Sequence, residues 1–267
     1  MKIILSRKGF DSKYGGIPSP ILPDGTLLSL PIPQKDGRAY SELNYDGVTY
    51  KSIIEQLGGK CGDNGCHLDP NIRRGLFEAP CNWKPVFGQK GTALTHLTNQ
   101  NVGIGDLFLF FGWFRQTEQG KDGILRYAPK APNLHILYGY LQIGQVVTGA
   151  DVEKYDWHPH SNDTTDSNRL FVAQEKSTWN NGINGWGVFS YDRKFVLTKE
   201  GMSRSCWCLP DIPAFAKKPK ISASRKDAWR VDPKHGEYYR AMDIGQEFVI
   251  EEIPAVAKWA KSLIKSI

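Results

Sequence analysis

The apolar run Leu107–Phe114, with the sequence LFLFFGWF, constrains the fold of this chain more than any other segment. It carries no charge and follows a Gly-Asp turn signal, which is typical of a strand buried on both faces. A second long apolar segment, residues 133–147, predicts another long strand with a bend at Gly139. We therefore expect a sheet built around two long strands.

Shorter segments complete this sheet. Residues 3–5, 169–175, 185–190 and 194–201 predict short strands, whereas residues 60–92 predict a long irregular segment. Pro254 opens a C-terminal amphipathic helix with lysines on its polar face. Its apolar stripe consists of Val256, Trp259, Ala260, Leu263, Ile264 and Ile267.

These elements predict a single α+β domain over residues 1–267, with a mostly antiparallel sheet and a few peripheral helices. The net charge is +6, and the basic excess lies in positions 1–100 and 201–267, which is compatible with a polyanionic partner. Five cysteines, no signal-peptide pattern and no run of 18 apolar residues lead us to expect a cytoplasmic protein without a membrane span.

The first strand leads into the polar stretch SRKGFDSKYGG, residues 6–16. Basic side chains and glycines there can bind a phosphate or carboxylate, and an acid can transfer protons. An Arg7–Asp11 ion pair that fixes the strand end is the equally weighted alternative. The candidates are Asp11 as a catalytic residue, with Arg7, Lys8, Ser12, Gly15 and Gly16 as substrate-binding residues.

His67 and Asp69 are two residues apart, so in an extended chain they point the same way and form a general-base pair. A plain turn before Pro70 is the alternative. A zinc site formed by Cys61, Cys66, His67 and Cys81 stays open, but its spacing is unusual and we assign no metal ligand.

His158 and His160 flank Pro159, which places both rings on one side of an extended chain and suits proton transfer or a divalent metal. An exposed polar loop is the alternative. Gln89 and His96 are further substrate-binding candidates, although a glutamine also caps helices and a histidine among leucines is often simply half-buried.

Basic side chains around a tryptophan can neutralise phosphates and stack a base. A solvated charged loop is the alternative. The candidate nucleic-acid-binding residues are Lys217, Lys218, Lys220, Arg225, Lys226, Trp229 and Arg230.

Several motifs occur in an order that resembles the nucleotide modification associated domain family, type 3, of bacteria and phages. They include RKGFDSKYGGIPSP, CHLDP, FGQKGTALTHL, VGIGDLFLFFGWFR, LHILYGYLQIG, HPH and GQEFV. The resemblance covers nearly the whole chain and implies a link to DNA base modification, but it supplies no reaction and no catalytic residue.

A fainter, local similarity joins GDLFLFFGWFR and LHILYGYLQIG to the paired strands of PUA-like domains, which bind modified or flipped bases. It implies a partly open barrel over residues 102–200. Trp113 and Arg115, at the end of the first long strand, would then help to hold a base.

We therefore expect an enzyme that transfers a group to, or hydrolyses, a base, ribose or phosphate in a nucleotide or in nucleic acid, with DNA favoured. The alternatives are a non-catalytic reader of modified bases and a metal-dependent nuclease. Convergence of Arg7, Asp11, His67, Gln89 and His158 in one cleft would favour the enzyme over the reader. The sequence identifies neither a cofactor nor an oligomeric state.

Overall fold

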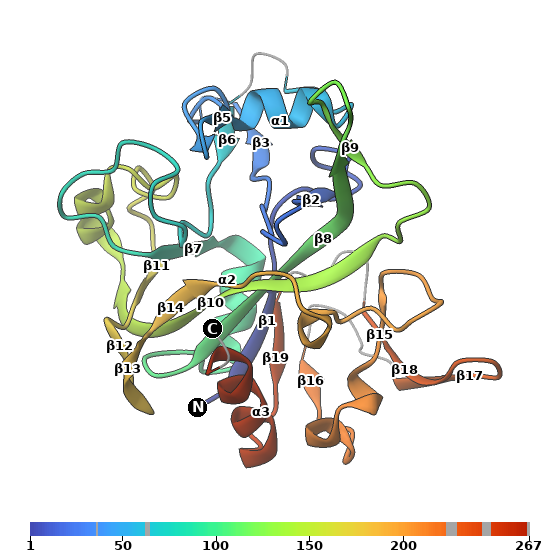
Figure 1. Cartoon of the computed structure of the whole chain (residues 1–267). Helices are drawn as coiled ribbons and strands as arrows, with labels where there is room; N and C mark the ends of the chain where they lie inside the picture. The colour runs from blue at the N-terminus through green and yellow to red at the C-terminus, as the bar shows by residue number, and fades with distance from the viewer. Residues whose placement is uncertain (36, 62–64, 223–228, 242–246, 266–267) are drawn as a thin grey trace.

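The computed structural model describes residues 1–35, 37–61, 65–222, 229–241 and 247–265. Within these ranges ten strands form one open sheet, and Figure 1 shows its two longest strands crossing the molecule side by side. The main path runs β16 (Ile221–Ser222), β19 (Glu247–Ile250), β1 (Ile3–Arg7), β8 (Leu107–Gln119), β10 (Leu134–Val147), β11 (Asn168–Ala173), β7 (Val86–Lys90).

Three further strands join this sheet at its long members. β14 (Trp186–Val188) pairs with β10, whereas β2 (Ser19–Ile21) and β9 (Leu125–Tyr127) pair with β8. β1 and β2 run parallel to β8, and the other pairings are antiparallel. The predicted α+β class with a mostly antiparallel sheet is therefore confirmed.

Four smaller sheets are separate from the large one. They consist of β3 (Ile32–Gln34) with β6 (Gly65–His67), β4 (Asn44–Tyr45) with β5 (Val48–Thr49), β12 (Lys176–Ser177) with β13 (Asn180–Asn184), and β15 (Cys206–Trp207) with β18 (Gly236–Arg240) and β17 (Trp229–Asp232).

Helices cover the outside of the sheets. The α-helices are α1 (Tyr50–Gln56), α2 (Gly91–Asn99) and α3 (Pro254–Ile264); the 3-10 helices are η1 (Gly149–Tyr155), η2 (Arg193–Phe195), η3 (Leu209–Asp211) and η4 (Pro213–Phe215). No described helix is long and apolar enough to span a membrane.

Both long predicted strands form, and the register of β10 against β8 shifts between Leu137 and Gly139, where the sequence predicts a bend. Two local predictions are wrong. Residues 194–201 contain part of η2 instead of a strand, and the segment expected to be irregular contains β6 and β7. β7 pairs with β11, a partner that lies about 80 residues further along the chain and that no local pattern announces.

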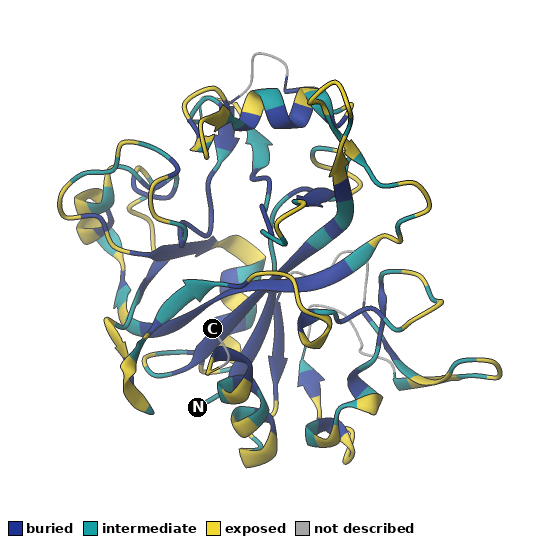
Figure 2. Ribbon diagram, in the orientation of Figure 1, coloured by how far each residue is buried: buried dark blue, intermediate teal, exposed yellow. Residues whose placement is uncertain are grey.

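The main core lies between the large sheet and its covering elements, and Figure 2 shows most of the two long strands in the dark blue of buried residues. A second apolar cluster lies under α1 and includes Phe10, Tyr40, Ile54 and Cys66. Strands from both ends of the chain, β1 and β19, pair in the large sheet. The single domain and the PUA-like arrangement of residues 102–200 stay predictions. The strands of residues 102–200 share one open sheet with strands from both ends of the chain.

The C-terminal helix docks as its apolar stripe predicts. Val256, Ala260, Leu263 and Ile264 are buried, whereas Ile267 lies outside the described residues. Trp259 is half-buried against the core, and its ring meets that of Phe215 edge-on at a centroid distance of 5.2 Å.

We predict that Trp259→Ala lowers the free energy of unfolding by about 2 kcal/mol, less than for a fully buried tryptophan, because part of the indole is exposed. Lys258→Ala, on the exposed face of the same helix, serves as the control and should change it by less than about 0.5 kcal/mol. Urea denaturation of both variants tests this, and equal effects would contradict the docking.

Candidate functional site

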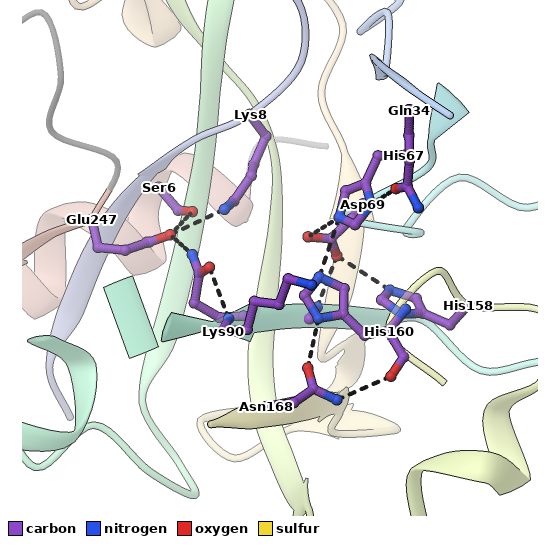
Figure 3. A network of polar contacts seen from close by, with 12 residues as sticks. Ser6, Lys8, Gln34, His67, Asp69, Lys90, His158, His160, Asn168 and Glu247 are labelled. Carbon is purple, nitrogen blue, oxygen red and sulfur yellow. Dashed lines mark hydrogen bonds and ion pairs between the residues drawn. The ribbon is translucent and has the colours of Figure 1, made fainter. Parts of the chain in front are cut away.

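Four polar side chains from separate parts of the chain meet beside β7. His67 ends β6, and Asp69 follows it by two residues. His158 and His160 lie on the turn segment between η1 and β11. Figure 3 shows the three imidazoles gathered around the Asp69 carboxylate. The two His-containing pairs that the sequence singles out are therefore halves of one cluster.

The Asp69 side chain is almost fully buried. Its Oδ1 accepts a hydrogen bond from the Gly88 backbone N–H at 2.8 Å and one from His158 Nε2 at 3.2 Å. Its Oδ2 lies 3.9 Å from His67 Nε2. Burial alone would raise the pKa of Asp69, but the His158 hydrogen bond and nearby positive charge outweigh it and hold the pKa below its usual value. Asp69 is therefore an ionised carboxylate at neutral pH.

The surrounding hydrogen bonds determine which ring nitrogen of His158 carries its proton. The His160 backbone N–H donates to His158 Nδ1 at 3.3 Å, so this nitrogen presents its lone pair. The proton is then on Nε2, where it is donated to Asp69. His158 thus holds the carboxylate in place from behind.

His67 and His160 face each other, with their Nε2 atoms 3.1 Å apart. His160 Nδ1 contacts Asn168 Oδ1 at 2.7 Å, and His67 Nδ1 contacts Gln34 Oε1. Burial is the main cause that lowers the pKa of both rings, to about 4 for His67. Both rings are therefore neutral at pH 7, each with one nitrogen available as a base or ligand.

Gly88 allows the rings to pack this closely to β7. A Cβ added at Gly88 would lie 2.5 Å from His160 Cδ2 and 2.8 Å from His158 Cε1. Because real Cβ atoms do not approach other atoms so closely, a side chain here would displace the two histidines. Packing of the two histidines therefore requires a glycine at position 88, whereas the backbone conformation of β7 does not.

The cluster opens into a cleft of about 710 Å³, a size typical of small-molecule sites. The opposite wall centres on Glu247, whose Oε1 accepts hydrogen bonds from Ser6, Lys8 and Gln89. Figure 3 shows this second group across from the imidazoles. The lining residues are Arg7, Lys8, Gly9, Asp11, Tyr14, Ile32, Pro33, Gln34, His67, Asp69, Gln89, Lys90, Thr92, Ala93, His96, Pro159, His160, Asp163 and Glu247.

The charge of this lining is mixed. Arg7, Lys8 and Lys90 are its basic side chains, and four carboxylates oppose them. Lys8 forms a buried ion pair with Glu247 at 3.1 Å, and Lys90 lies 3.9 Å from Asp163. The cleft therefore offers both hydrogen-bond donors and acceptors, without the strong positive field of a simple phosphate site.

Most of the predicted polar residues converge on this cleft. Arg7, Asp11, His67 and Gln89 line it, and His158 lies directly behind Asp69. Asp11 also has a structural role, since its Oδ1 accepts from the backbone N–H groups of Lys13 and Tyr14.

Other candidates from the opening stretch lie outside the lining. Ser12 Oγ contacts the Arg204 guanidinium. Gly15 has a positive φ of 87°, and a Cβ there would enter the Phe10 ring at 2.2 Å. Gly16 also has a positive φ, of 71°. The glycines thus serve the turn, and the ligand-binding role predicted for Ser12, Gly15 and Gly16 gains no support from their positions.

The aromatic and basic candidates at a distance are also outside the lining. Trp113 donates to Asn133 and packs against Arg204, and Arg115 lies over the Tyr127 ring. Lys218 pairs with Glu237, and Trp229 meets Tyr239 edge-on. Lys217, Lys220 and Arg230 do not line the cleft, whereas Arg225 and Lys226 lie outside the described residues.

The cysteines form no metal centre in the part of the chain that the structure describes. Cys61 and Cys66 are buried in the cluster under α1, and burial raises the pKa of Cys66 to about 12. Cys81 is exposed. The described group that could hold an ion consists of His67, Asp69 and His160.

Sequence reasoning missed Gln34, Gly88, Lys90, Asn168 and Glu247. Each is an ordinary polar or glycine residue in its local sequence, and its role depends on a partner far along the chain. Local signals exist for two of them, since Lys90 is next to the candidate Gln89 and Glu247 belongs to the GQEFV motif.

A cleft on which several polar and titratable side chains converge is the default candidate for a ligand-binding or active site. The family model described as nucleotide modification associated domain 3 matches residues 2–251. The chain belongs to this family, so the predicted resemblance is confirmed and the domain is associated with nucleotide modification. Searches of curated proteins and of solved structures found no match.

We predict that Gly88→Ala displaces His158 and His160 and lowers the free energy of unfolding by about 1–3 kcal/mol. Gly103→Ala is the matched control, since a Cβ there meets no atom within 4 Å and should cost less than about 0.5 kcal/mol. Denaturant titration checks the energies. A harmless Gly88→Ala would show that the rings do not pack against this strand.

Proposed function

We propose that this chain is an enzyme that acts on a nucleotide or on a base in nucleic acid, with the His67–Asp69–His160 cluster as its reactive centre. The observation that carries the proposal is the convergence of this cluster with Arg7, Lys8 and Gln89 in one cleft. Catalysis requires such convergence, because reacting groups must lie within hydrogen-bond reach of one substrate. A reader of modified bases needs no buried carboxylate beside three imidazoles.

In this proposal one wall of the cleft supplies the reactive groups and the other binds the substrate. On one wall, neutral His67 and His160 each present one nitrogen lone pair that can act as a base or as a ligand, while His158 keeps Asp69 oriented. On the other, Arg7 and Lys8 line the cleft and can contact a substrate phosphate, although the carboxylate of Glu247 already offsets the charge of Lys8. Gln89 lines the same wall, with its amide nitrogen donated to Glu247 Oε1, and can contact the polar edge of a base or a ribose hydroxyl.

The size of the cleft supports a substrate of nucleotide dimensions. Its volume of about 710 Å³ falls in the upper part of the range for small-molecule sites. A base from a duplex would have to be flipped out to reach the imidazoles, because a stacked base cannot enter a cleft. DNA as the substrate, and group transfer or hydrolysis as the reaction, are part of the proposal.

Mass spectrometry of nucleosides from cellular DNA tests the proposal. Cells expressing the wild-type chain should show a new or missing nucleoside, and cells expressing His67→Ala should not. His235 lies on the turn that joins β17 to β18 and does not line the cleft, so His235→Ala should behave as the wild type.

Identical nucleosides in all three cultures, together with tight binding of a modified nucleotide by the purified chain, would contradict the enzyme and favour the reader. A nucleoside change that persists in His67→Ala would place the chemistry elsewhere in the molecule.

A further inference from the structure

We infer that the cleft binds one divalent first-row transition-metal ion through His67 Nε2, His160 Nε2 and a carboxylate oxygen of Asp69. The three potential ligand atoms lie within 4.8 Å of one another. The inference rests on the proposed function for the role of the ion in the cleft, but binding of the ion can be measured without any activity.

The hydrogen bonds of Asn168 determine which ring nitrogen of His160 carries the proton. Asn168 Nδ2 donates to two backbone carbonyls, His160 O at 3.0 Å and Asp163 O at 2.6 Å. This fixes the orientation of the amide, so its Oδ1 faces His160 Nδ1 at 2.7 Å and must accept a proton from it. The lone pair of His160 is therefore on Nε2, which points to the cleft.

His67 is also contacted by a side-chain amide, that of Gln34. Its Nδ1 contacts Gln34 Oε1, an acceptor, so the proton lies on Nδ1 and the lone pair on Nε2. The two Nε2 lone pairs then face each other at 3.1 Å. Two acceptors at this distance repel unless something positive lies between them, and a metal ion removes the conflict.

The carboxylate is prepared in the same way. Asp69 Oδ1 is occupied by the Gly88 N–H and His158 Nε2, which leaves Oδ2 directed towards His67. Each of the three ligands is thus oriented by a hydrogen bond from behind. Such outer partners are typical of metal sites, where they fix the ligand tautomer and the ring orientation.

The spacing fits an ion. Two nitrogens 3.1 Å apart and each about 2.1 Å from a metal subtend about 95° at it, an angle within the range of four- to six-coordinate sites. A shift of Asp69 on the order of 1 Å completes three bonds. Two imidazoles and one carboxylate suit zinc, cobalt, iron(II) or manganese(II), and leave positions open to the cleft for water or a substrate oxygen.

The charge of the cleft supports the same conclusion. Four carboxylates line it against three basic side chains, which disfavours a phosphate. A divalent ion reverses this balance and lets the cleft accept an anionic nucleotide.

The competing arrangement is a hydrogen bond in which one Nε2 carries a proton and donates it to the other. It requires Gln34 to turn its amide nitrogen towards His67 Nδ1 or His160 to lose its bond to Asn168. In that case the cluster binds no metal and acts as a pure acid–base pair.

Metal titration of the chelator-treated full chain distinguishes the two arrangements. The exposed thiol is removed by Cys81→Ser in every sample, and Co²⁺, Mn²⁺ and Zn²⁺ are titrated with calorimetry, with the visible spectrum of Co²⁺ as a second readout. We expect one equivalent to bind, with affinity about 100-fold weaker or lost in His67→Ala and about 10-fold weaker in Gln34→Ala. His96→Ala, which removes a cleft-lining imidazole outside the cluster, should bind as tightly as the parent.

No saturable binding by the folded parent chain, or binding that His67→Ala leaves unchanged, would overturn the inference. Circular dichroism of each variant shows whether it is folded. If His67→Ala does not fold, the milder Gln34→Ala still tests the inference. A nucleoside change without metal binding would leave the proposed function standing alone. Metal binding with identical nucleosides and tight binding of a modified nucleotide would refute the function and keep the site.

Discussion

The buried carboxylate of Asp69 is the constraint on which the site depends. An ionised group in the interior is costly unless hydrogen bonds replace the water it has lost. The Gly88 N–H and His158 supply those bonds. To do so, β7 must pass close to the carboxylate without a side chain at position 88, and the turn after η1 must fold back over the same strand. The cleft forms where β7 passes Asp69 and the turn after η1 folds over this strand.

The same logic extends outward from the cluster. Asn168, at the first position of β11, ties His160 to the sheet, because its amide bridges the ring and two carbonyls of the preceding turn. Pairing of β11 with β7 then places that turn opposite Asp69. The large sheet thus determines the positions of ring nitrogens that are about 90 residues apart in sequence. The side-chain amide of Asn168 thus connects the large sheet to the histidine cluster.

Local patterns in the sequence were sufficient for part of this account. The apolar runs gave β8 and β10, the lysine-backed stripe gave α3, and spacing by two residues paired His67 with Asp69 and His158 with His160. The contact between the two pairs is long-range, and neither hydrophobic periodicity nor composition predicts contacts of this kind. Gln34, Asn168 and Glu247 look like surface residues until their partners are known. For Gly15 the sequence suggests a ligand-binding role, but in the structure the missing side chain leaves room for the Phe10 ring.

The central claim is that two side-chain amides hold His67 and His160 so that both Nε2 lone pairs face the cleft. The most direct test is a two-bond proton–nitrogen correlation spectrum of the six imidazole rings in metal-free, ¹⁵N-labelled protein near neutral pH, assigned with single His→Gln variants. We predict protons on Nδ1 of His67 and His160 and on Nε2 of His158. A proton on Nε2 of either His67 or His160 would contradict it.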